Sequence, residues 1–448
     1  MIKTLFTLAL AITFQQIAFT QSSNWARLAS DSDSATFEKL IDPKEYSIST
    51  MNVEKIKEWQ HNSSISGDSL FRLLSNWNTF PEIKQTGIVI KLSADIDSNY
   101  SVPFFVYVPK NYNPKQKTVL LVYYKGGWLA RRELPNNFSK EIIIDNPTLA
   151  YLDEYNVVEV FPALKSDLAI YGNYGYRHLS GMIKETKKRF NIDDNKVFLA
   201  GYSDGGKTVY NASYLAQTTV ACFYPINGAV VSPPFFPNWY NRPIFSIVAK
   251  RDELTDPRSI RSKAKHAVDR GANWIYRELD KTHYYKPYAH EILPALFQHM
   301  MQTNRNPFPT RIVYDRSFND VRDFPGVDWL QMEVNTKKAP SPNHFTDSIQ
   351  TFAGDGEERN YRYGENVGQV RAVFFDNVFT VTTSQVDKLI LYISPLMVNM
   401  NLPVKIILNG KEVFNNKVEY SKEFMTEKFL NDFDRGQVFV NQIVIDVP

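Results

Sequence analysis

Residues 195 to 206 read Asn-Lys-Val-Phe-Leu-Ala-Gly-Tyr-Ser-Asp-Gly-Gly. The apolar residues 197 to 200 predict a buried strand, and the chain from Gly205 onward favours a helix. Between the strand and the helix lies the motif Gly201-x-Ser203-x-Gly205. When a strand, a tight turn and a helix follow one another in this order, the serine in the turn has a strained backbone and an exposed hydroxyl. The alternative is a glycine turn that only begins a helix, but the flanking elements favour the strained serine.

The same alternation of strand and helix extends to both sides of this motif. Apolar runs predict strands at residues 88–90, 104–108, 119–123, 157–161, 244–248 and 274–279. Helical periodicity predicts helices at residues 179–190, 205–216, 259–270 and 288–300. Strands that alternate with helices of this length predict an α/β fold with a mainly parallel central sheet and helices on both faces.

The alternation stops near residue 305, and short strand-like runs with turns follow, including an Asn409-Gly410 hairpin signal. A smaller C-terminal β-rich domain is therefore expected after the α/β domain. Residues before 85 are polar and show no continuous strand or helix pattern, apart from one helix expected near residues 69–76. We expect them to form an extension packed on the main domain. The predicted organisation is a leader at 1–20, an extension at 21–84, an α/β domain at 85–304 and a β-rich domain of unknown role at 305–448.

The first twenty residues have the features of a cleavable export signal. Lys3 precedes an apolar run, and Ala18-Phe19-Thr20 supplies small residues before the expected cleavage point. We expect a secreted or periplasmic protein without a membrane span, because no later stretch reaches about 20 apolar residues. Cys222 is the single cysteine, which excludes an intramolecular disulfide and a lipid-modified cysteine after the signal, and its apolar neighbours predict an inert buried thiol.

Composition excludes several classes of function. The net charge is +3, with 51 basic and 48 acidic residues interleaved along the chain. Such a balance creates no single-sign field that would recruit nucleic acid or an anionic membrane. Nucleotide-binding glycine loops and Cys/His metal spacings are missing from the sequence, so neither a cofactor nor a metal is expected.

A serine hydroxyl becomes a good nucleophile when a base accepts its proton and a third group orients that base. Asp252 follows the expected strand at 244–248, and His283 follows the one at 274–279. Because the carboxyl ends of parallel strands meet at one sheet edge, Ser203, Asp252 and His283 are expected to converge there. Asp256 and Asp280 are alternative acids, and Asp252 is favoured because it lies nearest its strand end. The other histidines lie on expected helices or in polar surroundings.

Backbone N–H groups that hold a developing oxyanion are expected from two places. The strand at 119–123 is followed by Lys125-Gly126-Gly127-Trp128, whose glycines allow the backbone to turn toward a substrate oxygen. The predicted donors are the N–H of Gly127 or Trp128 together with that of Asp204. A plain glycine turn is the alternative for this loop.

Residues 85 to 300 resemble the α/β-hydrolase superfamily. The resemblance rests on the stretch from residue 190 to the end of the serine motif at residue 206, on the loop at 125–128, and on Asp252 with His283. It is to secreted bacterial esterases of the polyhydroxybutyrate-depolymerase, feruloyl-esterase and acetyl-xylan-esterase type, and to the hydrolase domain of prolyl oligopeptidases. It implies Ser203 as nucleophile, His283 as base and Asp252 as the residue that orients it. Lys125 departs from the histidine that many relatives carry there.

The expected function is hydrolysis of carboxylic esters, on a small molecule or linked to a polysaccharide. A serine peptidase of the prolyl-oligopeptidase type is one alternative, although the residues before Gly87 are too few for the β-propeller of those enzymes. A catalytically silent binding protein is the other. The aromatic segment at residues 232–240 and the tyrosines at 284 and 285 predict either a pocket wall or core packing.

Overall fold

The computed structural model describes residues 53–134, 143, 146–172, 174–230, 236–317, 326–353 and 355–448. The expected leader at residues 1–20 lies outside the described residues.

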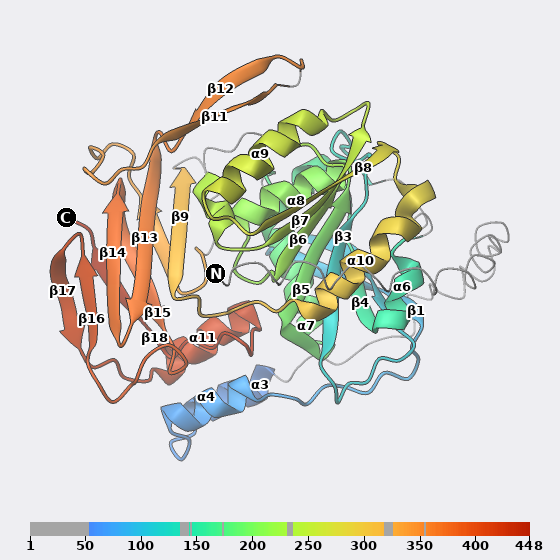
Figure 1. The fold of residues 1–448 in the computed structure, drawn as a ribbon. Coiled ribbons are helices and arrows are strands. Elements are labelled where there is room, and N and C mark those ends of the chain that lie inside the picture. The colour runs from blue at the N-terminus through green and yellow to red at the C-terminus, as the bar shows by residue number, and fades with distance from the viewer. Residues whose placement is uncertain are drawn as a thin grey trace, which may run out of the picture. The chain divides into compact units, whose positions relative to one another are not determined.

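The central sheet has eight strands in the order β1-β2-β4-β3-β5-β6-β7-β8 (Figure 1). β2 is antiparallel to both of its neighbours, and the strands from β4 across to β8 are parallel. Its strands are β1 (Ile88–Asp97), β2 (Tyr100–Val108), β3 (Thr118–Tyr124), β4 (Val157–Phe161), β5 (Ile192–Tyr202), β6 (Cys222–Ile226), β7 (Ile244–Arg251) and β8 (Trp274–Thr282).

Helices cover both faces of this sheet. β4 and β5 lie on opposite sides of β3, so right-handed crossovers place the helix before β4 and the helix before β5 on opposite faces. Tyr151 on α6 (Leu149–Tyr155), the helix before β4, stacks on Phe297 of α10 (Ala289–Gln302) with ring centroids 5.5 Å apart. The helices are α6 (Leu149–Tyr155), α7 (Gly175–Lys187), α8 (Asp204–Leu215), α9 (Pro257–Asp269) and α10 (Ala289–Gln302), with 3-10 turns η1 (Ser166–Leu168), η2 (Phe236–Tyr240) and η3 (Lys286–Tyr288). The expected α/β fold class is confirmed.

The chain after residue 310 forms the β-rich region, as expected. The region contains a five-stranded sheet in the order β17-β16-β14-β13-β9 and a three-stranded sheet in the order β10-β15-β18, and their apolar side chains form one buried core that includes Trp329. β11 and β12 form a separate two-stranded hairpin. The strands are β9 (Arg311–Ser317), β10 (Leu330–Val334), β11 (Asp347–Phe352), β12 (Glu358–Tyr363), β13 (Val367–Phe375), β14 (Val378–Ser384), β15 (Val386–Ile393), β16 (Val404–Leu408), β17 (Lys411–Asn416) and β18 (Asn441–Asp446).

The N-terminal extension packs on a helix of the β-rich region, α11 (Lys422–Asp432), which differs from the expectation. The extension contains α3 (Val53–His61) and α4 (Gly67–Ser75). Their apolar side chains form one buried cluster with those of α11 and of the chain after it, Ile56 and Leu74 with Met425 and Phe429 among them. The extension was expected to pack on the α/β domain, but its apolar face is buried against the C-terminal helix.

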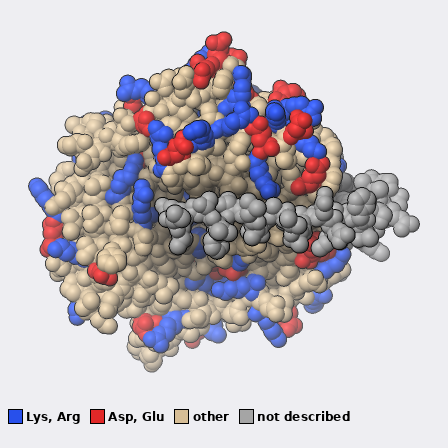
Figure 2. Space-filling model, viewed as in Figure 1, with Lys and Arg blue, Asp and Glu red and all other residues tan. Residues whose placement is uncertain are grey.

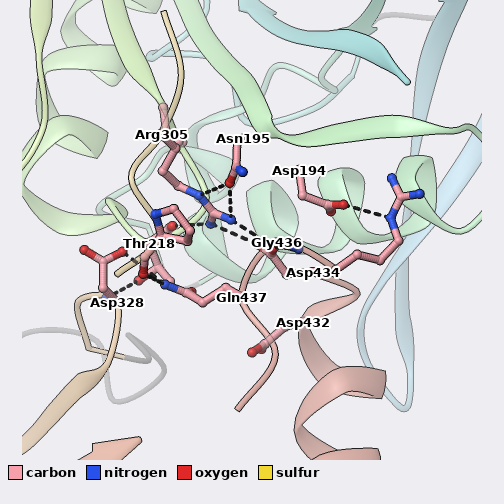
Figure 3. A network of polar contacts seen from close by, with 12 residues as sticks. Asp194, Asn195, Thr218, Arg305, Asp328, Asp432, Asp434, Gly436 and Gln437 are labelled. Atoms are coloured by element: carbon pink, nitrogen blue, oxygen red, sulfur yellow. Dashed lines mark hydrogen bonds and ion pairs between the residues drawn. The ribbon is translucent and has the colours of Figure 1, made fainter. Parts of the chain in front are cut away.

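A buried group of charges joins the β-rich region to the α/β part of the chain (Figure 3). Asp434 lies between Arg305, whose two terminal nitrogens are each 2.9 Å from its carboxylate oxygens, and Lys187 at 3.5 Å. Arg435 binds Asp194 at 2.8 Å. Although burial raises the pKa of a carboxyl group, the charges of Arg305 and Lys187 outweigh it and lower the pKa of Asp434 to about 2.

Replacing Asp434 with alanine is expected to lower the free energy of unfolding by about 3–5 kcal/mol, because it leaves the buried Arg305 without its carboxylate partner and removes one of the two carboxylates that pair with Lys187, the other being Asp194. Urea unfolding at neutral pH measures the change. Glu333→Ala is the control, since Glu333 pairs with Lys388 at an exposed position where an ion pair contributes about 0–1 kcal/mol. Equal stability of the Asp434 variant and the wild type would contradict the role of this cluster.

The surface carries both signs of charge. On the face drawn in Figure 2, Lys and Arg side chains lie interspersed with Asp and Glu side chains. None of the helices in the described part of the chain combines the length and the apolar character that crossing a bilayer requires.

Candidate active site

Ser203 is the residue between β5 and α8, and its backbone is strained. Its φ is 56° and its ψ is −115°, a conformation that costs a non-glycine residue about 1–3 kcal/mol. Neighbouring glycines make the turn possible, because a Cβ on Gly205 would lie 1.8 Å from the carbonyl oxygen of Tyr124. A Cβ on Gly201 would lie 2.6 Å from the carbonyl group of Gly205. The strained serine between strand and helix is therefore where the motif predicted it.

Ser203, His283 and Asp252 form one hydrogen-bonded chain. The Nε2 atom of His283 lies 2.8 Å from the Oγ atom of Ser203. The Nδ1 atom of the same ring lies 2.8 Å from Oδ2 and 2.9 Å from Oδ1 of Asp252. The side chains of His283 and Asp252 are 7% and 1% exposed, so water competes little for these bonds. The structure thus brings together the three residues that the strand ends predicted.

The acids near this chain have different partners. Asp252 follows β7, and its Oδ1 accepts the backbone N–H groups of Leu254 at 2.9 Å and Thr255 at 2.8 Å. Asp256 instead caps α9 by accepting the N–H of Arg258 at 2.9 Å. Asp280 forms an exposed ion pair with Arg251. Of the three acids considered from the sequence, Asp252 is the one in contact with His283.

Asn227, which the sequence analysis did not identify, holds the strand ends around His283 together. It follows β6 directly, and its amide nitrogen donates to the carbonyl oxygen of His283 at 2.7 Å and to the Tyr288 hydroxyl at 2.8 Å. Its amide oxygen accepts the N–H of Ala249 on β7 at 2.9 Å. A polar residue immediately after the buried run 222–226 was the available signal. Asn227 fixes the loop that carries the imidazole.

Aromatic side chains pack against the imidazole of His283. The ring centroid of Tyr202 lies 5.3 Å from that of His283 and 4.6 Å from that of Tyr285. Tyr285 is buried and its hydroxyl binds that of Tyr123, whereas Tyr284 is 54% exposed. Burial raises the pKa of Tyr202 well above its usual range, so this phenol stays neutral beside the histidine.

The aromatic segment before β7 contributes to the core. Phe236 and Trp239 are fully buried, and Trp239 packs edge-on against Trp274 with ring centroids 4.9 Å apart. Residues 231–235 lie outside the described residues. Of the two alternatives for this segment, its described part matches core packing. Cys222 is also buried, and burial raises the pKa of its thiol to about 12, as expected for an inert cysteine.

The strand order with β2 antiparallel, and a strained serine in the turn after the central strand β5, together define the fold. The chain has the α/β-hydrolase fold. In the α/β-hydrolase layout, the serine, the acid and the histidine come in this order along the chain and follow separate strands. Here Ser203 follows β5, Asp252 follows β7 and His283 follows β8.

The oxyanion donors proposed from the sequence need one correction. The N–H of Trp128 donates to Oδ2 of Asp204 at 2.9 Å, so it is already bonded within the protein. The sequence could not show that the side chain beside Ser203 would bind this amide. Gly127 remains as the candidate of the loop after β3, with a φ of 74° and open space where a Cβ would lie. Asp204 begins α8, and the N–H groups of the first helical turn have no partner within the helix.

The described residues lack a group of side chains that could bind a metal ion, because no three His, Cys, Asp or Glu side chains among them are grouped so as to hold one.

Solved structures with this hydrolase fold resemble about half of the chain. A thermostable esterase matches with 19% identity and a TM-score of 0.40, over 48% of this chain and 63% of its own length. Fluorophosphonate-binding serine hydrolase F of Staphylococcus aureus matches with 13% identity and a TM-score of 0.39, over 48% of this chain and 99% of its own. Est1E from Butyrivibrio proteoclasticus matches with 13% identity and a TM-score of 0.36, over 47% of this chain and 99% of its own. No protein-family model matches the sequence, and no curated protein matches it.

Proposed function

We propose that the protein is a serine hydrolase that cleaves carboxylic ester bonds through an acyl-enzyme on Ser203. The observation that carries this proposal is the unbroken hydrogen-bonded chain from Ser203 Oγ through both nitrogens of His283 to Asp252. Such a chain makes an alcohol nucleophilic, because the imidazole accepts the hydroxyl proton while the carboxylate stabilises the imidazolium that forms.

In the first half of the reaction, the Ser203 oxygen attacks the carbonyl carbon of the ester and its proton passes to Nε2 of His283. The tetrahedral intermediate then expels the alcohol, which takes that proton from Nε2 as the C–O bond breaks. Asp252 accepts the Nδ1–H of His283 throughout, so the imidazole keeps the tautomer whose Nε2 is free to accept a proton. An acyl group remains on Ser203.

In the second half, a water molecule gives a proton to Nε2 of His283 and attacks the acyl carbon. The bond to the Ser203 oxygen breaks, and this oxygen takes the proton back as the carboxylic acid leaves. In both halves the negative oxygen would be held by the N–H groups of Gly127 and Asp204, where preorganised donors stabilise developing charge. The chemistry uses side chains and backbone of this chain, with a small-molecule or polysaccharide-linked ester as the proposed substrate.

A fluorophosphonate probe tests the proposal directly, because it phosphonylates serines that an adjacent base has activated. We expect the native protein to be labelled at Ser203, as located by mass spectrometry of the labelled peptide, and the heat-denatured protein to be unlabelled. As the probe is titrated, hydrolysis of short p-nitrophenyl esters should fall in proportion to the labelled fraction of the protein. A native protein that reacts with neither probe nor ester, or is labelled at a different residue, would overturn the proposal.

The type of bond is tested in the same preparation. Acetylated, feruloylated and aliphatic esters are compared with peptide substrates at equal concentration, and hydrolysis of esters over peptides is expected. Preference for peptides would support the peptidase alternative, whose chemistry at Ser203 is the same. Export through the expected leader stays a prediction.

A further inference from the structure

The side chain of Asp204 binds the loop that follows β3. Its Oδ2 accepts the N–H of Trp128 at 2.9 Å and the N–H of Leu129 at 3.1 Å. Asp204 is the first residue of α8 and follows Ser203 directly. These two bonds therefore tie the loop after β3 to the residue beside the proposed nucleophile.

The loop also lies against Ser203 itself. A Cβ on Gly126 would lie 3.0 Å from the Cβ of Ser203, so a larger residue at this position would crowd the serine. Beyond it, Arg131 closes a turn by donating its backbone N–H to the carbonyl oxygen of Trp128 at 2.9 Å and its Nε–H to that of Gly127 at 3.1 Å. Gly127 lies between the contact with Ser203 and the amides that Asp204 binds.

A carboxylate suits this position for two reasons. Hydrogen bonds to an ionised acceptor are about twice as strong as neutral ones, so a single oxygen can hold two amides firmly. The first turn of a helix also favours negative charge, because its free N–H groups carry partial positive charge. Without the carboxylate, the N–H groups of Trp128 and Leu129 lose their partner, and the turn that contains Gly127 loses its tie to α8.

We propose that the Asp204 carboxylate is a positioning residue for the oxyanion hole. It holds the loop so that the N–H of Gly127 and the N–H of Asp204 face the same developing charge beside Ser203. This inference rests on the proposed acyl transfer at Ser203 and adds to it a residue that acts through the loop. An acidic residue that only stabilised the start of α8 would change the stability of the protein and leave the reaction itself unaltered.

The test compares Asp204→Ala and Asp204→Asn in steady-state hydrolysis of a p-nitrophenyl ester. Loss of an oxyanion donor lowers kcat by about 10²–10³-fold, and we expect the alanine variant to lose this much with KM within about threefold of the wild type. The asparagine variant keeps an acceptor oxygen without its charge, and we expect it to recover most of kcat, to within about tenfold of the wild type. Inhibition by a trifluoromethyl ketone, whose adduct on a serine carries an oxyanion, should weaken in parallel with kcat/KM.

Asp256→Ala is the matched control, because it also removes a carboxylate from the start of a helix, with an amide bond at 2.9 Å. It is expected to keep kcat and ketone affinity. If the wild-type protein neither reacts with a fluorophosphonate nor hydrolyses esters, the proposed function fails. If the wild type is active and both Asp204 variants keep its kcat and ketone affinity, only the positioning role fails. Should the alanine variant not fold, the asparagine variant decides: a fall of kcat and of ketone affinity in parallel, by up to about tenfold, supports the role, and unchanged values or a change in KM alone would refute it.

Discussion

The Ser203→Ala variant is expected to hydrolyse short p-nitrophenyl esters no faster than background, with a loss in kcat on the order of 10⁶-fold. Removing Oγ removes the atom that would carry the acyl group and the partner of His283 Nε2 at 2.8 Å. The fold should persist, since alanine is no larger than serine and faces the same positive φ of 56°. Steady-state kinetics and thermal unfolding of the same preparation measure both expectations.

A second serine serves as the control for this substitution. Ser180 lies on α7, and its hydroxyl donates to the carbonyl oxygen of Arg177 within the same helix at 3.2 Å. The Ser180→Ala variant should therefore keep full activity and full labelling by a fluorophosphonate. Substantial turnover by the Ser203 variant, with an intact fold, would mean that a different group attacks the ester.

Most of the central sheet could be predicted because its strands are buried. The runs at 119–123, 157–161 and 244–248 are short and mostly apolar, which is typical of parallel strands covered on both faces. The outer strands were harder to predict. β1 extends to Asp97 and pairs antiparallel with β2, and its outer part alternates buried with exposed residues. The predicted strand at 88–90 covered only its fully buried beginning.

The packing of the N-terminal extension could not be predicted for a different reason. α4 was expected close to its observed bounds, but its apolar residues Leu70 and Leu74 give no indication of their partner. That partner, α11, lies more than 340 residues away in a stretch predicted as β-rich, and its alternation of charged and apolar residues gives little amphipathic pattern. Sequence periodicity shows which face of a helix is buried and leaves open what covers it.

Some residues of the proposed site could be predicted from the sequence and others could not, for the same reason. Ser203, Asp252 and His283 could be located because each follows a predicted strand, and the topology then brings strand ends to one edge. The error at Trp128 arose because its amide is bonded by a side chain 76 residues away. Asn227 was missed since its role depends on three strand ends meeting at one side chain. Contacts made by side chains across the fold are what the sequence did not predict.

The Asp252→Asn variant is expected to lose about 10⁴-fold in kcat while its structure and KM stay close to those of the wild type. The reason lies in the second set of bonds that Asp252 makes. Its Oδ1 accepts two backbone N–H groups, from Leu254 and Thr255. In the asparagine variant the amide oxygen must occupy this position, because an NH₂ group there would face two donors. The NH₂ group then faces Nδ1 of His283, where Oδ2 was 2.8 Å away.

An NH₂ group in that position donates to Nδ1 and so forces the ring proton onto Nε2. The Nε2–H of His283 then points at the Ser203 oxygen and cannot accept its proton, which is why a substitution of equal size abolishes most of the rate. Asp256→Asn separates this effect from any loss of negative charge in the same loop. Asparagine caps helices as well as aspartate does, so this variant should keep kcat within about twofold. If the two variants lost activity equally, the loop charge rather than the tautomer of His283 would govern the reaction, and the role proposed for Asp252 would be wrong.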